Sequence, residues 1–390
     1  MIRFFNKFLP YSRQEVKEED IKNVVKVLKS DYLTQGDNVP LLENEISNKV
    51  KSKYCVGVNS ATSALHLSCL ALGLKEKDIL WTSPNSFVAS ANCGQYCGAE
   101  VDFVDIDPSS GLIDVELLKE KLVMAKNKKK LPKILIPVHF AGVSCDMEAI
   151  HKLSKEYGFS VIEDASHALG GKYKNYFVGS CKYSSITVFS FHPVKIITTG
   201  EGGCATTNDK DLAEKLFTLR SHGIEKNKEK FLFTAKGGWS YEQQLLGFNY
   251  RMSDIHAALG VSQLKRLNKI IRIRNEKLNT YLNLLSQLPL TIYTPPKEII
   301  STVHLAVIKL DNKDPFFHKY MFNQLREKGI GVQVHYAPIH LNPYYRERGF
   351  KEGDFPNAEE HASNALSIPL YTTLSESDQM RVAKTLKKLL

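Results

Sequence analysis

The sequence predicts an α/β protein. Its large domain should have a mostly parallel mixed sheet flanked by helices, followed by a smaller C-terminal α+β domain. Strand-like and helical patterns alternate through the first part of the chain, which favours parallel strands joined by crossover helices. A length of 390 residues suits about two domains. From Met252 the pattern changes to a long helical stretch, and we place the boundary inside it, giving domains 1–265 and 266–390.

The large domain is expected to begin with a helix over 12–29, because Ser12 and Glu15 have the spacing of a capping box. A strand at 54–58 leads into a helix over 62–72 that Gly73 ends. Further β-rich runs lie at 79–82, 101–106, 133–138, 159–163, 184–191 and 204–207. Helical patterns separate or follow them at 86–98, 114–125, 147–156 and 209–220. In the C-terminal part we expect helices over 252–285, 314–328 and 375–389 and strands near 302–310 and 331–336.

Composition and charge indicate an ordinary globular protein. Hydrophobic residues make up 43% and charged residues 24% of the chain, and the net charge is +10. Such a charge suits a nucleic-acid binder or a basic surface for phosphorylated substrates. We favour the second interpretation, because the lysines are scattered or lie in short runs such as 126–130, and no nucleic-acid-binding motif accompanies them.

The cysteines and the N-terminus predict a cytoplasmic location. Seven cysteines fall at irregular spacings, most of them in apolar segments, as reduced core residues do. Cys93 and Cys97 are four residues apart, but no second pair completes a metal site, so no metal is expected. The segment 1–9 is too short and interrupted for a signal peptide, and no apolar run is long enough to span a membrane.

Lys195 and Asp164 are the residues that most directly suggest chemistry. Lys195 follows an apolar, β-rich run and precedes the glycine-rich turn 200–203. Asp164 directly follows the strand-like run 159–163. Pyridoxal phosphate needs a lysine for its aldehyde and a carboxylate for its ring nitrogen. A structural role for both residues together is the alternative, and it explains less of their surroundings.

The segment 59–65 supplies a candidate phosphate site. It leads from a strand into a helix through small residues, and the free N–H groups of a helix N-terminus attract anions. Ser or Thr at such a position often only caps the helix. Ser190 could add a hydroxyl, and Phe87 follows a strand where an aromatic ring could stack on a pyridine or belong to the core. Neither a P-loop nor a dinucleotide-binding glycine pattern is present.

The chain resembles the sugar aminotransferases of the DegT/DnrJ/StrS family, which are fold-type I pyridoxal-phosphate enzymes. The resemblance runs from Leu33-Thr34-Gln35-Gly36 to Val334-His335-Tyr336-Ala337-Pro338, and its most specific parts are the segments 163–170 and 189–203. Ser-His-Ala-Leu-Gly after Asp164 and Phe-His-Pro-Val-Lys ending at Lys195 are similar to members that act in pseudaminic acid biosynthesis. Those members move an amino group from L-glutamate to C4 of a UDP-linked 4-keto-6-deoxy-N-acetyl hexose.

The resemblance implies a role for each candidate residue. Lys195, Asp164 and His167 would be catalytic: Lys195 would carry the cofactor and move protons, Asp164 would keep the ring nitrogen protonated, and His167 would lie against the ring. The further cofactor contacts implied are Thr62, Ser63, Phe87, Ser190 and Asn249. The substrate contacts implied are His304, His335 and Tyr336. Asn249 would act in the neighbouring subunit, which implies a homodimer with shared active sites.

Other functions remain open from the sequence. The same fold could aminate a different nucleotide-linked 4-keto sugar, of the perosamine or 4-amino-arabinose type. A non-catalytic, regulatory pyridoxal-phosphate-binding protein is a second alternative, but such a chain would not need both Lys195 and Asp164. Related sugar dehydratases have a histidine in place of the lysine. Here Lys195 is retained, which favours transamination.

Overall fold

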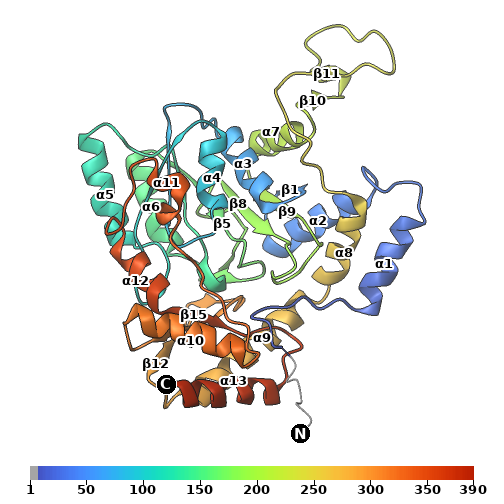
Figure 1. Ribbon diagram of the computed structural model, residues 1–390. Coiled ribbons are helices and arrows are strands. Elements are labelled where there is room, and N and C mark those ends of the chain that lie inside the picture. The colour runs from blue at the N-terminus through green and yellow to red at the C-terminus, as the bar shows by residue number, and fades with distance from the viewer. Residues whose placement is uncertain (1–7) are drawn as a thin grey trace.

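A seven-stranded sheet forms the centre of the large domain, in the order β1-β9-β8-β5-β4-β2-β3 (Figure 1). The strands from β8 to β3 pair in parallel, and β9 is antiparallel to both of its neighbours. All strands except β9 therefore point in one direction. The strands are β1 (Tyr54–Val58), β2 (Ile79–Thr82), β3 (Glu100–Phe103), β4 (Ile134–Ile136), β5 (Ser160–Asp164), β8 (Ile186–Ser190) and β9 (Gly203–Thr207).

Helices cover both faces of this sheet because alternate strand residues point to opposite sides. Leu80, Ile134 and Ile162 pack on one face, whereas their neighbours Trp81 and Leu135 pack on the other. The first face is covered by α3 (Ala61–Ala71), α4 (Ala89–Tyr96) and α7 (Lys210–Arg220). The second is covered by α2 (Asn38–Val50), α5 (Val115–Asn127), α6 (Met147–Tyr157) and α8 (Asp254–Leu264). This arrangement confirms the predicted α/β architecture.

The C-terminal part builds a second core around an antiparallel three-stranded sheet in the order β12-β14-β15. Its strands are β12 (Leu290–Ile292), β14 (Ala306–Leu310) and β15 (Ala365–Ile368). Its helices are α9 (Leu267–Leu285), α10 (Pro315–Glu327), α11 (Pro343–Arg346), α12 (Pro356–Asn364) and α13 (Glu376–Leu389). The proposed domain boundary near residue 265 falls between α8 and α9.

Short elements complete the fold. Two of them, β10 and β11, lie in an arm that extends from α7 away from the rest of the molecule (Figure 1). The short strands are β6 (Lys172–Tyr173), β7 (Tyr176–Phe177), β10 (Ile224–Glu225), β11 (Glu242–Gln243) and β13 (Ile299–Ile300). Three 3₁₀ turns are η1 (Phe140–Gly142), η2 (Lys228–Lys230) and η3 (Ile339–Leu341).

Several predicted boundaries were wrong. The first helix, α1 (Glu18–Leu28), begins at Glu18 rather than at residue 12, because the Ser12 hydroxyl donates to the Val194 carbonyl instead of capping a helix. The helical stretch 252–285 is divided between α8 and α9. The expected strand at 331–336 forms only one bridge, between Gln333 and Ser367. The helix α2 was not predicted at all.

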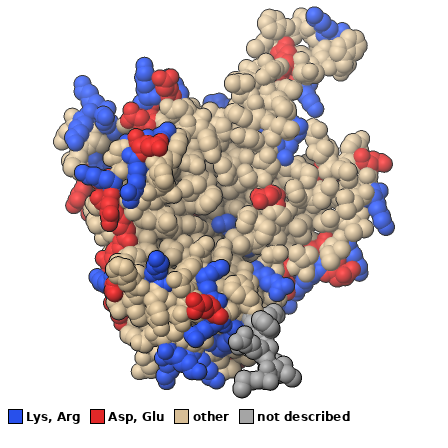
Figure 2. Space-filling view, viewed as in Figure 1, with Lys and Arg blue, Asp and Glu red and all other residues tan. Residues whose placement is uncertain are grey.

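The structure describes residues 8–390, so most of the N-terminal segment considered as a leader lies outside the described residues. Across this range, no helix combines the length and apolar character that crossing a bilayer requires. On the face shown in Figure 2, basic side chains lie mainly at the margins with acidic ones beside them, and uncharged residues make up most of its centre.

Candidate active site

A cavity of about 490 Å³ lies at the carboxyl ends of the parallel strands, where open α/β sheets bind their ligands. The residues that follow β1, β2, β5 and β8 line it together with the segment 333–336 of the C-terminal part. Sequence-predicted residues that line the cavity are Thr62, Phe87, Asp164, His167, Ser190, Lys195, His304, His335 and Tyr336. The fold therefore brings together residues that are up to 274 positions apart, from Thr62 to Tyr336.

The N-terminus of α3 forms one end of the cavity. Ser60 caps the helix by accepting a hydrogen bond from the Ser63 N–H at 3.1 Å. Ala61 and Thr62, whose N–H groups belong to the first turn, line the cavity. Because such groups have no partner within the helix and the helix dipole is positive there, this end suits a phosphate.

A glycine allows the sheet to approach this helix end closely. A Cβ atom at Gly203 in β9 would lie 2.5 Å from the Ala61 nitrogen, closer than real Cβ atoms come to such an atom. A residue without a side chain is therefore required where β9 supports the first turn of α3.

Asp164, the last residue of β5, presents a buried carboxylate to the cavity; only 5% of the residue is exposed. Its Oδ2 accepts a hydrogen bond from Ser90 Oγ at 2.7 Å. Its Oδ1 accepts from Ser166 Oγ at 2.6 Å and from the Ser166 N–H at 3.1 Å. These donors fix the orientation of the carboxylate. Ser90 and Ser166 were missed by sequence reasoning, because serines in a helix and in a turn carry no distinctive signal.

Lys195 lies in the loop between β8 and β9 and lines the same cavity. Desolvation lowers the pKa of Lys195 to about 8, and the negative charge of Asp164 opposes this effect. At neutral pH an appreciable fraction of the amine is therefore unprotonated, which is the form that attacks a carbonyl group.

A buried aromatic cluster lies beside this pair. The Tyr336 hydroxyl hydrogen-bonds His167 Nε2 at 3.1 Å, and the rings of His167 and His304 are 4.2 Å apart. Burial and the nearby charge of Lys195 lower the pKa of His167, so its ring is neutral. His335 is held by Ser367, whose Oγ lies 2.8 Å from Nδ1, and burial lowers the pKa of His335 to about 3.

Two predicted cofactor contacts do not line the cavity. The Ser63 hydroxyl points back to Asn59 Oδ1, to which it donates at 2.6 Å. Asn249 is exposed and bridges to Ser221. Phe87 lines the cavity but is 61% exposed, so it lies at the rim.

The residues present fit pyridoxal phosphate. A lysine with a lowered pKa, a buried carboxylate and a helix N-terminus match the aldehyde, the ring nitrogen and the phosphate of this molecule. Nδ1 of His167 is buried and has no hydrogen-bond partner in the described chain, which leaves a polar atom for a bound group to satisfy. Among residues 8–390, no cluster of three or more His, Cys, Asp or Glu side chains could hold a metal.

Comparisons with known proteins identify the family of the chain. The model of the DegT/DnrJ/EryC1/StrS aminotransferase family matches residues 14–387. The UDP-4-amino-4,6-dideoxy-N-acetyl-beta-L-altrosamine transaminase of Campylobacter jejuni is 37% identical, over 98% of this chain and 97% of that protein. The spore coat polysaccharide biosynthesis protein SpsC of Bacillus subtilis is 38% identical, over 97% and 96% respectively.

Two solved structures have the same fold. The chain is similar to Helicobacter pylori PseC, described as an aminotransferase involved in the biosynthesis of pseudoaminic acid, with a TM-score of 0.89 at 33% identity. That match covers 98% of this chain and 99% of PseC. The putative sugar aminotransferase Spr1654 of Streptococcus pneumoniae, solved in its PLP and PMP forms, matches with a TM-score of 0.88 at 26% identity over 98% of both chains.

Proposed function

Since the chain belongs to the DegT/DnrJ/EryC1/StrS aminotransferase family, we propose that it moves an amino group from L-glutamate to C4 of a UDP-linked sugar. The proposed acceptor is UDP-2-acetamido-2,6-dideoxy-β-L-arabino-hex-4-ulose, and the proposed pathway is pseudaminic acid biosynthesis. The coarser activity is established by the family: the protein is a sugar-nucleotide aminotransferase that uses pyridoxal phosphate. The observation that carries the site assignment is the meeting of Lys195 and Asp164 in one cavity.

Four residues of the cavity have tasks in this proposal. When bound, the cofactor supplies an electron sink that makes a C–H bond next to the transferred nitrogen acidic. Lys195 binds the cofactor aldehyde and, once free, takes and returns that proton with Nζ. Asp164 holds a proton on the ring nitrogen through a carboxylate that Ser90 and Ser166 orient. Thr62 and Ser190 are assigned to the phosphate.

The proposed sugar substrate rests on the names of the relatives rather than on the residues of the cavity. The Campylobacter jejuni transaminase and Helicobacter pylori PseC both carry names that refer to this type of sugar or to its pathway. SpsC is equally similar in identity and is named for a spore coat polysaccharide. A different nucleotide-linked 4-keto sugar, of the perosamine or 4-amino-arabinose type, is therefore the second candidate. A regulatory, non-catalytic role is the least supported, because the chain has both Lys195 and Asp164.

We also propose a homodimer in which Asn249 acts in the partner's site. Asn249 is exposed and does not line the cavity of its own chain. The arm next to it carries large apolar side chains that are exposed to solvent: Phe233 and Trp239 are each 79% exposed and Leu246 is 82% exposed. Exposed apolar side chains in such a projecting segment are typical of a surface that another chain covers.

Mixing two inactive variants tests the shared site. Lys195→Ala and Asn249→Ala chains are unfolded together, refolded and assayed. A shared site predicts about one quarter of wild-type activity, because half of the random dimers are mixed and each mixed dimer has one intact site. Each variant refolded alone is the control. Activity in the mixture no higher than in the controls would contradict the shared site.

The reaction itself is tested by its two half-reactions. Glutamate should convert the yellow, lysine-bound form of the cofactor to the pyridoxamine form, which is then freed of excess glutamate. Return of the visible band is followed after adding UDP-, GDP- and dTDP-linked 4-keto sugars one at a time. Return with the proposed UDP-linked sugar alone supports the proposal. If the band returns only with another sugar, the proposed substrate is wrong. If glutamate causes no change, the proposed amino donor is wrong.

A further inference from the structure

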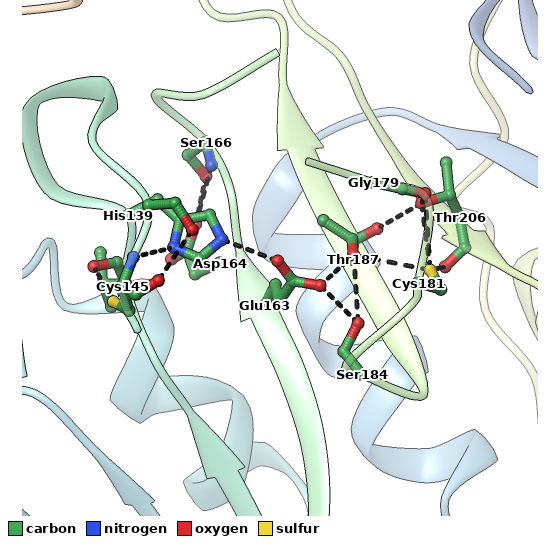
Figure 3. Close-up of polar contacts among 12 residues, drawn as sticks. His139, Cys145, Glu163, Asp164, Ser166, Gly179, Cys181, Ser184, Thr187 and Thr206 are labelled. Atoms are coloured by element: carbon green, nitrogen blue, oxygen red, sulfur yellow. Dashed lines mark hydrogen bonds and ion pairs between the residues drawn. The ribbon is translucent and has the colours of Figure 1, made fainter. Parts of the chain in front are cut away.

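A buried hydrogen-bonded pair lies directly behind the candidate active site (Figure 3). His139 Nε2 is 2.8 Å from Glu163 Oε2, and neither residue lines the cavity. His139 is fully buried and Glu163 is 5% exposed. The other carboxylate oxygen of Glu163 accepts hydrogen bonds from Ser184 Oγ at 2.5 Å and Thr187 Oγ1 at 2.9 Å.

The hydrogen bonds define the charges of this pair. The Cys145 N–H donates to His139 Nδ1 at 3.2 Å, so Nδ1 carries no proton. Burial by itself would lower the pKa of His139, whereas its side-chain hydrogen bonds with Cys145 and Glu163 raise it to about 10. The backbone N–H aimed at Nδ1 nevertheless excludes a proton there, so we assign the neutral tautomer, in which Nε2 donates to Glu163. Burial by itself would raise the pKa of Glu163, but hydrogen bonds from His139, Ser184 and Thr187 lower it below its ordinary value. Glu163 is an anion with three donors around it.

Both residues adjoin Asp164: Glu163 precedes it in the sequence, and His139 is bonded to its backbone. The His139 N–H donates to the Asp164 carbonyl at 3.0 Å, and the Asp164 N–H donates to the Pro137 carbonyl at 2.9 Å. Pro137 has no N–H group, so it cannot add a ladder hydrogen bond of its own to β5. The side-chain bond from His139 to Glu163 joins the two chain segments next to this gap.

We propose that His139 and Glu163 act as positioning residues for Asp164. Their side-chain bond holds the extension of β4 against the end of β5, and so fixes the backbone from which the Asp164 carboxylate projects. Glu163 does this as a hydrogen-bond acceptor and has no contact with the reacting atoms. This inference rests on the role of Asp164 in the proposed function, and it adds two residues that none of the previous assignments includes.

A second histidine–glutamate pair, of which the histidine is buried and the glutamate partly exposed, supplies a control. His340 Nε2 is 2.8 Å from Glu359 Oε1, His340 is fully buried, and neither residue lines the cavity. The variants Glu163→Leu, Glu163→Gln, Glu359→Leu and Asp164→Asn are loaded with pyridoxal phosphate. Three properties are measured for each: the pH midpoint of the visible band, the dissociation constant of the cofactor, and the melting temperature.

The readout is the basicity of the nitrogen that joins Lys195 to the cofactor. A protonated ring nitrogen makes this joining nitrogen less basic, so loss of the ring proton should raise the pH midpoint. Asp164→Asn is expected to raise it by about one unit, a tenfold change in proton affinity. The titratable groups that face the same region are Asp164 itself, Tyr11, His167, His192, Glu201, His304, His335 and Tyr336.

We expect Glu163→Leu to shift the midpoint in the same direction as Asp164→Asn and to weaken cofactor binding about 10- to 100-fold, as loss of supporting partners does in metal sites. Glu163→Gln should stay near the wild-type midpoint. Its amide oxygen can still accept from His139 while its NH₂ group donates to the hydroxyls of Ser184 and Thr187. Glu359→Leu should lower the melting temperature and leave the midpoint unchanged.

The outcomes separate this inference from the proposed function. A wild-type midpoint and cofactor affinity in folded Glu163→Leu, together with a shifted midpoint in Asp164→Asn, would overturn the positioning role and leave Asp164 in place. An unshifted Asp164→Asn would overturn the assigned role of Asp164 itself. A shift in Glu163→Gln as large as in Glu163→Leu would show that charge matters, and would also overturn it. If Glu163→Leu does not fold, His139→Leu is compared with His340→Leu in the same way.

Discussion

The lowered pKa of Lys195 predicts how the capture of pyridoxal phosphate by the cofactor-free protein depends on pH. Desolvation lowers this pKa from 10.5 to about 8. At pH 7 a lysine with that pKa is about 9% neutral, whereas an ordinary lysine is about 0.03% neutral. Because only the neutral amine attacks the aldehyde, Lys195 should react about 300-fold faster at pH 7 than its ordinary pKa would allow, other factors being equal.

Stopped-flow growth of the visible band measures this rate between about pH 6 and pH 10. The rate should rise about tenfold per unit below pH 8 and level off above it. The neighbouring groups should not distort the curve: His167 and His335 stay neutral because their pKa values are lowered, and Tyr336 stays neutral because its pKa is raised. Nα-acetyl-lysine, whose side-chain amine is free, is reacted with the same cofactor solutions to correct for the titration of the cofactor itself.

The Asp164→Asn variant tests the direction in which Asp164 shifts the pKa of Lys195. The carboxylate of Asp164 favours the ammonium form of Lys195, so its removal should move the plateau to a lower pH. A wild-type rate that keeps rising in parallel with that of Nα-acetyl-lysine up to pH 10 would show that the pKa of Lys195 is not lowered. A plateau that moves to higher pH in Asp164→Asn would contradict the expected direction.

Two further predictions concern the supports of the site. Gly203→Ala places a Cβ atom 2.5 Å from the first backbone nitrogen of α3, and should lower the free energy of unfolding by about 1–3 kcal/mol. Equilibrium dialysis should show cofactor affinity reduced about tenfold, with Gly57→Ala, whose Cβ would come no closer than 3.4 Å to the Glu43 side chain, as the control. Asp20→Ala leaves the Arg266 guanidinium, 2.9 Å away, without its buried partner, so unfolding in urea should show a loss of about 3–5 kcal/mol. The exposed pair of Glu19 supplies its control, since Glu19→Ala should change stability by less than about 1 kcal/mol.

The sequence predicted the sheet well because its strands are short, apolar and separated by amphipathic helices. The expected run 54–58 coincides with β1, and 159–163 differs from β5 by one residue at each end. Lys195 and Asp164 could be recognised because each follows such a strand, and parallel strands bring their carboxyl ends to one edge of the sheet. Local patterns thus predicted Thr62, Asp164, Ser190 and Lys195, which line the cavity, whereas His167, His304, His335 and Tyr336 were predicted only from the family resemblance.

Segments whose conformation depends on distant contacts were predicted poorly. The run 331–336 looks like a strand, but the Tyr336 N–H donates to Asn85 Oδ1 and the His335 carbonyl accepts from His361, so these groups take no part in a ladder. Ser12 has the spacing of a cap, yet its hydroxyl bonds to Val194, which is 182 residues away. No local pattern contains such partners.

The supporting residues behind the site were also beyond sequence reasoning. Glu163 precedes Asp164 directly and reads as one more polar residue in a strand. Its partner His139 lies 24 residues earlier, after a different strand. Only the pairing of β4 with β5 brings the two together. Apart from their strand positions, the sequence gives no sign that they meet.

Reductive trapping can show whether Lys195 is the residue that carries the cofactor. Borohydride reduces the bond between a lysine and pyridoxal phosphate to a stable secondary amine, which peptide mass spectrometry can locate. We expect one labelled lysine, Lys195, and no label when glutamate has first converted the protein to the pyridoxamine form. Stoichiometric label on another lysine, or none on the freshly loaded protein, would contradict this assignment.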